Sequence, residues 1–151
     1  MAFFSRKPTR IPGYDYSKCN YYFITLCTYD KKCIFGSPQN LNRLGKIVQE
    51  HIENIKNHYK SVRVDNYVVM PNHVHMIITL QDEIHNPNIS SLVALFKTGV
   101  TKQIRLIEPD MKVWQRSFHD HIIRNQRSYE KIWEYIENNP LKWEEDCFYL
   151  R

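Results

Sequence analysis

Residues 67–80 read Tyr67-Val-Val-Met-Pro-Asn-His-Val-His-Met-Ile-Ile-Thr-Leu80, and the part after Pro71 has the composition of a β-strand. Side chains alternate between the two faces of a strand, so His73 and His75 are expected to share one face. Val74 lies between them and points to the opposite face, where it can anchor the strand in a core. Two neutral imidazoles on one rigid face form half of a divalent-metal site, which needs one or two further ligands.

The flanking sequence predicts an α+β fold around this strand. Strands are expected at 21–28, 61–70, 73–80 and around 114–123, and helices at about 40–58, 90–104 and 128–138. Only a tight turn at Pro71 and Asn72 separates two of the strands, which should therefore pair antiparallel. The order strand, helix, strand, strand, helix, strand, with a terminal helix, fits a ferredoxin-like split βαβ antiparallel sheet with helices on one face. The opposite face then remains for a ligand and for the last helix.

Capping and breaking residues set the expected helix boundaries. Asn40 is a candidate N-cap for the first helix, and Ser90 or Ser91 is expected to start the second. Pro140 is expected to end the third helix, because its ring and its missing N–H are incompatible with a helix interior.

Length and composition limit the classes of protein. The 151 residues predict a single domain, 1–151, with a basic and aromatic arm over residues 1–20. A net charge of +5 favours an acidic partner, of which nucleic acid is the commonest. No apolar run is long enough to cross a bilayer, and the N-terminus lacks the apolar core of a signal peptide. The four cysteines form no C-x-x-C pair, so we expect a reduced cytoplasmic protein without a zinc knuckle.

The last expected helix carries a tyrosine and an asparagine beside its apolar stripe. Four residues share the spacing of a buried face: Tyr129, Ile132, Trp133 and Ile136. Tyr135 and Asn139 are four residues apart and flank this stripe, so they lie one above the other. If the helix crosses the sheet beside the two histidines, a phenol and an amide oxygen meet two imidazoles. The alternative is that Tyr135 is a packing residue and that Asn139 caps the helix.

Three runs of sequence resemble a known family. The run Val69-Met-Pro-Asn-His-Val-His75 resembles the HUH motif of single-tyrosine transposases, in which two histidines enclose a hydrophobic residue. The runs from Trp114 to Asn125 and from Tyr135 to Leu141 are similar to those of the REP-associated tyrosine transposases in particular. The resemblance extends from the first strand to about Leu141 and therefore covers most of the chain.

The resemblance implies a metal-dependent endonuclease and strand transferase that acts on single-stranded DNA, often at hairpin-forming repeats. By the family pattern, His73 and His75 bind Mg²⁺ or Mn²⁺. Tyr135 is then the nucleophile that forms a 5′-phosphotyrosine, and Asn139 takes the position of the third metal ligand, where related insertion-sequence transposases commonly carry glutamine. Two other functions stay open: a domesticated module that binds a DNA or RNA hairpin without cutting it, and a metal nuclease that uses water.

A second H-x-H run, His119-Asp120-His121, is the main competitor within the sequence. Its middle residue is an acid, which cannot anchor a core face as Val74 can, so a metal site is less expected there. His121 is instead expected to contact DNA or to orient groups of the active site.

Basic side chains near the expected site are candidates for phosphate contacts. The candidates are Arg6, Lys7 and Arg10 of the arm, and Arg116, His121 and Arg124 around the last strand, followed by Lys97, Lys102 and Arg127. Arg124 is the first choice because it lies between the last strand and the tyrosine helix. The arm could alternatively cover an edge of the sheet. Both a monomer and a homodimer fit the sequence, and the short link at 125–128 favours a tyrosine that acts within its own chain.

Overall fold

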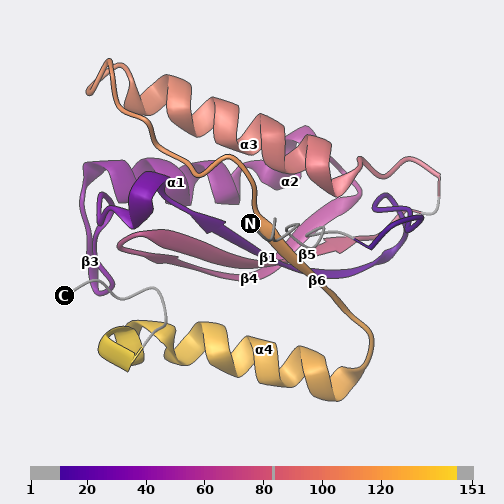
Figure 1. Cartoon of the computed structure of the whole chain (residues 1–151). Coiled ribbons are helices and arrows are strands. Elements are labelled where there is room, and N and C mark those ends of the chain that lie inside the picture. Colours follow the sequence, from indigo (N-terminus) through magenta and orange to yellow (C-terminus); the bar gives the residue numbers. More distant parts are fainter. Residues whose placement is uncertain (1–10, 83, 146–151) are drawn as a thin grey trace, which may run out of the picture.

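A computed structural model describes residues 11–82 and 84–145, which form an antiparallel sheet with helices on both faces (Figure 1). The strands of this sheet are β1 (Asn20–Cys27), β4 (Val62–Met70), β5 (His73–Leu80) and β6 (His119–Ile123). One face is covered by α1 (Arg43–Glu53), α2 (Ile55–His58) and α3 (Ile89–Ile104). The opposite face carries α4 (Gln126–Asn138). Shorter elements are the 3₁₀ helices η1 (Tyr29–Lys31) and η2 (Asn139–Glu145) and the hairpin of β2 (Gly36–Ser37) with β3 (Asn40–Leu41).

The strand order is β4-β5-β1-β6, and every neighbouring pair is antiparallel. β5 lies between β1 and β4, so the connection that runs from β1 through α1 to β4 passes over β5. The turn at Pro71 and Asn72 joins β4 directly to β5, and Met70 pairs with His73 across it. The predicted α+β fold and the antiparallel pairing of these two strands are therefore confirmed.

β5 is buried on both sides because each face of the sheet has its own core. The face under α1 and α3 receives Val74, Met76, Ile78 and Leu80. The face under α4 has a smaller apolar cluster of Ile77, Ile123 and Ile136. His73 and His75 lie on this second face. There His73 contacts the ring of Trp143 and His75 contacts the ring of Tyr135, both from the C-terminal part of the chain. The alternation predicted for this strand is confirmed.

The first helix begins later than its predicted cap. Asn40 belongs to β3, where it pairs with Ser37 in the short hairpin. The cap is Asn42, whose side-chain oxygen accepts a hydrogen bond from the backbone N–H of Gly45 at 3.0 Å. The prediction of Asn40 is wrong because the hairpin must close before the chain can enter the helix. The expected single helix also breaks at Asn54, which separates α1 from α2.

Two later boundaries also differ from the predictions. The side chain of Asn88 caps α3, so Ser90 and Ser91 lie inside its first turn and do not start it. β6 begins only at His119, because Trp114 makes an isolated bridge outside the ladder. The predicted strand from 114 is therefore too long at its start.

α4 begins two residues before its predicted start and ends where it was predicted to end. The side-chain oxygen of Asn125 accepts a hydrogen bond from the backbone N–H of Ser128 at 2.8 Å and caps the helix. The helix stops at Asn138, before Pro140, and the chain continues as η2. Within the described ranges, none of the helices combines the length and the apolar character needed to cross a lipid bilayer.

Candidate active site

Two buried imidazoles lie side by side at the start of β5. The ring centroids of His73 and His75 are 4.6 Å apart, with an angle of 70° between the ring planes. Their side chains are shielded from solvent, at 0% and 2% exposure. In the ladder with β1 they stand opposite Cys27 and Thr25. A central strand thus holds both rings on the face that α4 covers.

Hydrogen bonds at the Nδ1 atoms orient the two rings. Nδ1 of His73 lies 2.9 Å from Oδ1 of Asn72, while the amide nitrogen of Asn72 donates to the backbone carbonyl of Lys31 at 3.1 Å. Because the Asn72 oxygen accepts, Nδ1 of His73 is the donor, and the neutral form of this ring has its lone pair at Nε2. Nδ1 of His75 lies 2.8 Å from Oγ1 of Thr25. Metal-binding histidines are commonly oriented by such a contact at the ring nitrogen that does not bind the metal.

The protonation state of His75 also suits a metal ligand. Burial lowers the pKa of His75 well below its usual value, and the neighbouring His73 lowers it further. The ring is therefore neutral near pH 7 and keeps a lone pair for a cation. Two neutral imidazoles with an amide oxygen would form a donor set that fits Mn²⁺ well and Mg²⁺ less closely.

Asn139 supplies an amide side chain at the end of α4. It is buried, at 3% exposure, and begins η2. It lies in the chain between Tyr135 and Trp143, and the ring of Trp143 is 6.0 Å from that of His73. Its backbone N–H donates to the carbonyl of Ile136, so it is also the C-cap residue of α4. The cap uses only the backbone of Asn139, so a role of the side chain can be tested separately.

Tyr135 lies next to the histidine pair but is open to solvent. Its ring centroid is 5.2 Å from that of His75, with an angle of 62° between the planes. Its side chain is 42% exposed. It borders a cavity of about 480 Å³ whose other lining residues are Lys131, Glu134, Asn138, Asn139, Lys142 and Glu145. A substrate could therefore reach the phenol while the imidazoles stay enclosed.

Phe23 of β1 completes this cluster and was not identified from the sequence. Its ring stacks on His75 with a centroid distance of 5.3 Å and an angle of 26°. It also makes an edge contact with Tyr135 at 6.4 Å. The aromatic strand at 21–28 was predicted, but its register against β5 decides which aromatic side chain meets the histidines.

Polar contacts at two points hold α4 on the sheet. The hydroxyl of Tyr129 donates to Oδ2 of Asp65 at 2.7 Å. Further along the helix, the amide of Asn66 donates to Oε1 of Glu137 at 3.0 Å. Ile136, directly before Glu137, is buried against the sheet between these two contacts. The tyrosine and the histidine pair thus meet within one chain.

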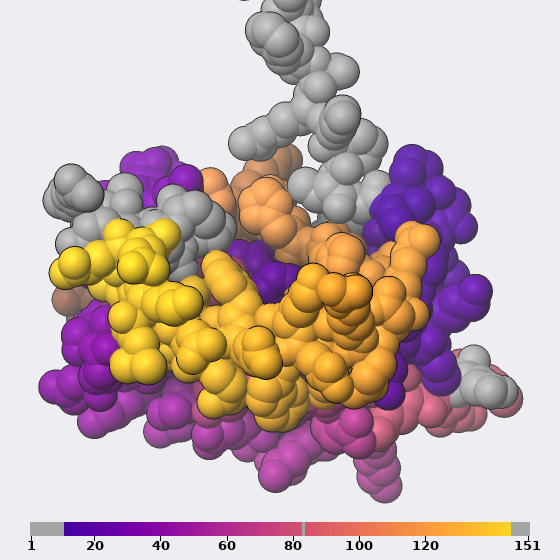
Figure 2. Space-filling view, turned by 90° about the horizontal axis from the view of Figure 1, so that it is seen from below, coloured from indigo at the N-terminus to yellow at the C-terminus, as the bar shows by residue number. Residues whose placement is uncertain are grey.

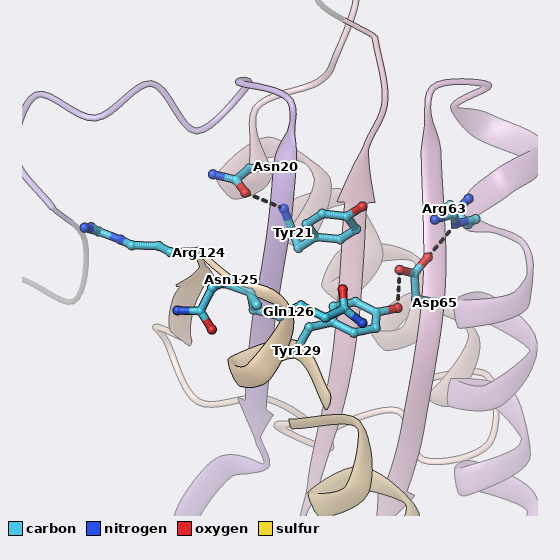
Figure 3. A pocket seen from close by; sticks show the side chains of 9 residues that line it. Asn20, Tyr21, Arg63, Asp65, Arg124, Asn125, Gln126 and Tyr129 are labelled. Carbon is cyan, nitrogen blue, oxygen red and sulfur yellow. Dashed lines mark hydrogen bonds and ion pairs between the residues drawn. The ribbon is translucent and has the colours of Figure 1, made fainter. Parts of the chain in front are cut away.

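Asp65 lies in a pocket of about 330 Å³ beside the start of α4 (Figure 3). It accepts hydrogen bonds from Arg63 at 2.5 Å, Tyr129 at 2.7 Å and Thr79 at 2.9 Å. Burial raises the pKa of Asp65, but these three donors outweigh burial and hold the pKa below its usual value. Burial and the neighbouring carboxylate raise the pKa of Tyr129. Tyr129, which the sequence indicated as a packing residue, is therefore also a hydrogen-bond donor.

The predicted DNA-binding residues lie in several places. His121 stands opposite Phe23 in the ladder of β1 and β6 and is exposed. Arg124 lines the pocket at the start of α4, where its side chain extends away from Asp65 (Figure 3). Arg116 lines a different cavity, beside α3. Arg6, Lys7 and Arg10 lie outside the described residues.

The α4 face is open on the side of β6. His119 and His121 are exposed there and stand opposite Thr25 and Phe23. Figure 2 shows α4 lying across this face, with atoms of β1 visible at the bottom of a hollow beside the helix. In the described ranges, no three His, Cys, Asp or Glu side chains gather closely enough to hold a metal ion. Either histidine pair would therefore need a ligand of another type, such as an amide oxygen.

Comparisons with known proteins agree with this arrangement. A family described as "Transposase IS200 like" matches residues 15–139. A protein of Haemophilus influenzae described as uncharacterized is 38% identical, over 96% of this chain and 93% of its own. The REP-associated tyrosine transposase of Escherichia coli K12 is 33% identical, over 52% of this chain and 44% of its own.

A solved structure shares the fold. It shows a REP-associated tyrosine transposase bound to a REP hairpin, with a TM-score of 0.63, 24% identity, and coverage of 95% of this chain and 74% of that chain. The resemblance to the single-tyrosine transposases, and to their REP-associated branch, is confirmed by the family match and by these relatives. With its HUH motif in a central strand and its tyrosine on the last helix, the chain belongs to the IS200-like transposase family.

Proposed function

We propose that the protein cuts and rejoins single-stranded DNA at hairpin-forming repeats, with Tyr135 as the nucleophile. A divalent ion would be held by His73, His75 and Asn139. The observation that supports this most directly is the 5.2 Å distance between the rings of Tyr135 and His75. The burial of His73 and His75 and the contacts that orient their rings through Nδ1 also suit a metal-ligand role.

The reaction exchanges one phosphate ester for another. The phenolic oxygen of Tyr135 attacks the phosphorus, and the bond from phosphorus to the 3′ oxygen breaks. The phenol gives up its proton, and the leaving 3′ oxygen gains one, so a 5′-phosphotyrosine and a free 3′-hydroxyl result. No water is consumed, so a 3′-hydroxyl can later attack the phosphotyrosine and join two strands. The bound ion would neutralise charge on the non-bridging oxygens.

The chain's own residues would orient the reacting groups. Asn72 and Thr25 fix the two imidazole rings through their Nδ1 atoms. Phe23 packs against both His75 and Tyr135 and keeps their rings in contact. Lys131 and Lys142 line the same cavity as the phenol, together with Glu134 and Glu145, so its charges balance and either lysine could contact a phosphate. These contacts support a nucleophile that would act at the border between an enclosed metal site and an open substrate cavity.

The proposed substrate rests on relatives. A protein of the same fold was solved with a REP hairpin bound. Hairpin DNA with single-stranded flanks is therefore the first substrate to test. A module that binds hairpins without cutting them would have no use for a tyrosine beside buried imidazoles. A hydrolytic nuclease would act through water and leave no covalent intermediate.

The test is covalent capture of labelled DNA. Hairpin oligonucleotides with randomised flanks and a 3′ label would be incubated with Mn²⁺, and labelled protein would be measured on a denaturing gel. The wild-type chain should become labelled, and Tyr135→Phe should not, while it still binds the hairpin. Tyr59→Phe, outside α4, is the matched control and should be labelled like the wild type. Labelling of the Tyr135→Phe variant would refute the assignment, and cleavage without labelled protein would favour hydrolysis.

A further inference from the structure

A basic groove lies between α3 and residues 112–116, outside the site described above. The cavity has a volume of about 600 Å³. None of the described residues that line it is acidic, and five are cationic: Lys97, Lys102, Arg105, Lys112 and Arg116. The whole chain has 21 Lys and Arg against 16 Asp and Glu, so a lining of a single sign departs from its average composition.

The five cations differ in what they do. Lys97 donates to the backbone carbonyls of Gln115 and Ser117, at 2.8 Å and 3.2 Å, and so ties α3 to the far wall. Arg105 donates to the carbonyl of Met111 at 3.2 Å. These three bonds join the two walls of the groove.

The other three cations, Lys102, Lys112 and Arg116, are exposed and face the cavity. The ammonium of Lys112 lies 5.1 Å from the ring centroid of Tyr29, a contact that holds the charge at the groove. Like charges gathered in this way repel one another and destabilise the compact state unless an anion offsets them. The groove is therefore suited to a ligand with several negative charges.

The groove lies at the same end of the sheet as the histidine pair. Its wall joins β1, because the backbone N–H of Gln115 donates to the carbonyl of Cys27 at 2.9 Å. Cys27 stands opposite His73 in the next ladder. Neighbouring strands are about 4.8 Å apart, so the wall is roughly 10 Å from the strand that carries the histidines. α3 and α4 cover opposite faces, so a chain in the groove would reach Tyr135 around the β6 edge (Figure 1).

We infer that this groove binds the sugar-phosphate backbone of the DNA whose scissile phosphate reaches Tyr135. The inference rests on the proposed function. DNA carries closely spaced negative charges, and a set of lysine and arginine side chains without carboxylates matches them. The exposed β6 side of the α4 face, with its hollow beside α4 (Figure 2), offers the way from the groove to the phenol. The contact would be to phosphates and therefore independent of base sequence.

The test compares two variants with equal changes of charge. The groove variant carries Lys102→Gln, Lys112→Gln and Arg116→Gln. The control carries Lys46→Gln, Lys56→Gln and Lys60→Gln, three exposed lysines that lie outside the groove. Both are made in the Tyr135→Phe background, so that binding is measured without covalent trapping. A variant with Lys102→Gln and Arg116→Gln alone serves if the triple groove variant unfolds.

Affinity for hairpin DNA is measured at several salt concentrations. Each phosphate contact contributes about 0.7–0.9 to the slope of log K against log salt, so the groove variant should lose about 2–3 from that slope and about tenfold or more in affinity at low salt. A hairpin without flanks and a flank without a hairpin are tested separately. A loss of affinity for either DNA supports the inference and shows whether the groove binds the hairpin or the flank. Affinities of the groove variant equal to those of the control variant for both DNAs would overturn it.

Failure of this inference can be told from failure of the proposed function. If the otherwise wild-type chain forms the phosphotyrosine adduct while the groove variant binds DNA like the control, only the groove is refuted. The opposite result is also distinguishable. If the groove variant loses the salt dependence of hairpin binding and the wild-type chain forms no adduct, the groove is supported and the proposed chemistry is refuted.

Discussion

The ring of Tyr135 lies 5.2 Å from the ring of His75, although α4 carries one and the central strand β5 carries the other. The imidazole is buried and neutral, whereas the phenol is 42% exposed. The two sides of this contact suit two tasks, with the enclosed side holding an ion and the open side meeting DNA. Substitutions on the two sides should therefore have separable effects.

Removal of either histidine should abolish most metal-dependent activity. His73→Ala and His75→Ala are each expected to slow adduct formation by at least about 100-fold, since even the loss of a group that only orients a ligand costs 10–100-fold. Initial rates would be measured over a range of Mn²⁺ concentrations, with hairpin binding in EDTA as a separate readout. His58→Ala, on exposed α2, is the matched control. An unchanged rate in either variant would remove the metal role of that histidine.

Thr25→Val tests the contact that orients His75. The change keeps the shape of the side chain but removes the oxygen that lies 2.8 Å from Nδ1. We expect Mn²⁺ affinity to fall by about 10–100-fold, measured by calorimetry, with little change in hairpin binding. Thr98→Val removes a hydroxyl that bonds only within α3 and should have no effect on metal affinity. Equal affinities in the two variants would contradict a metal site at His75.

Asn139 can be tested by comparing two replacements. Its backbone N–H makes the helix cap, and both Asn139→Gln and Asn139→Ala keep this group. Only the glutamine keeps an amide oxygen, so Asn139→Gln should retain more Mn²⁺-dependent adduct formation, and Asn139→Ala should lose about tenfold or more. Thermal unfolding of both variants checks the fold. Wild-type rates in Asn139→Ala would show that the amide is not a ligand.

Asp65 should make the stability of the protein depend on pH in acid. Its pKa is lowered in the folded state, so its contribution is present above the unfolded value of about 3.9 and is lost as pH falls through the folded value. Asp65→Asn should therefore lower the free energy of unfolding by about 1–3 kcal/mol at pH 7.

The difference between this variant and the wild type should narrow as the pH falls below about 4. Urea unfolding at pH 7 and at successively lower pH values measures it. Asp110→Asn, at an exposed position, provides the comparison and should show no such dependence. A constant difference at every pH would mean that Asp65 acts by packing alone.

Local periodicity was enough to predict the two halves of the candidate site. The alternation in β5 set His73 and His75 on the face opposite the main core, and the helical spacing in α4 placed Tyr135 beside the apolar stripe. Both patterns belong to a single strand or helix, so the local sequence is enough to predict them. That the two elements meet could be predicted only on the condition that the last helix crosses the sheet beside the histidines.

Contacts between distant strands could not be predicted. Thr25 and Phe23 reach His75 because β1 pairs with β5 in one particular register. This register cannot be predicted from the sequence of either strand alone. The cap of α1 was missed for a related reason, since Asn40 and Asn42 are equally good caps until the hairpin takes the first. The basic groove likewise joins α3 to a loop that follows it.

The layer that carries Tyr135 buries less apolar surface than the layer on the opposite face. α4 fully buries Ile136 and packs Tyr129, Ile132 and Trp133 only in part, whereas α3 fully buries Ile89, Leu92, Val93, Phe96, Val100 and Ile104. The free energy needed to separate a helix from the sheet grows with the apolar area that it buries. Local opening of α4 should therefore cost less free energy than unfolding of the sheet with α1 and α3. Brief lifting of this helix would uncover the imidazoles and admit an ion or a strand end, while the sheet and its opposite layer stay intact. Tyr135 is thus carried by a helix whose displacement from the sheet exposes less apolar surface than displacement of α3 would.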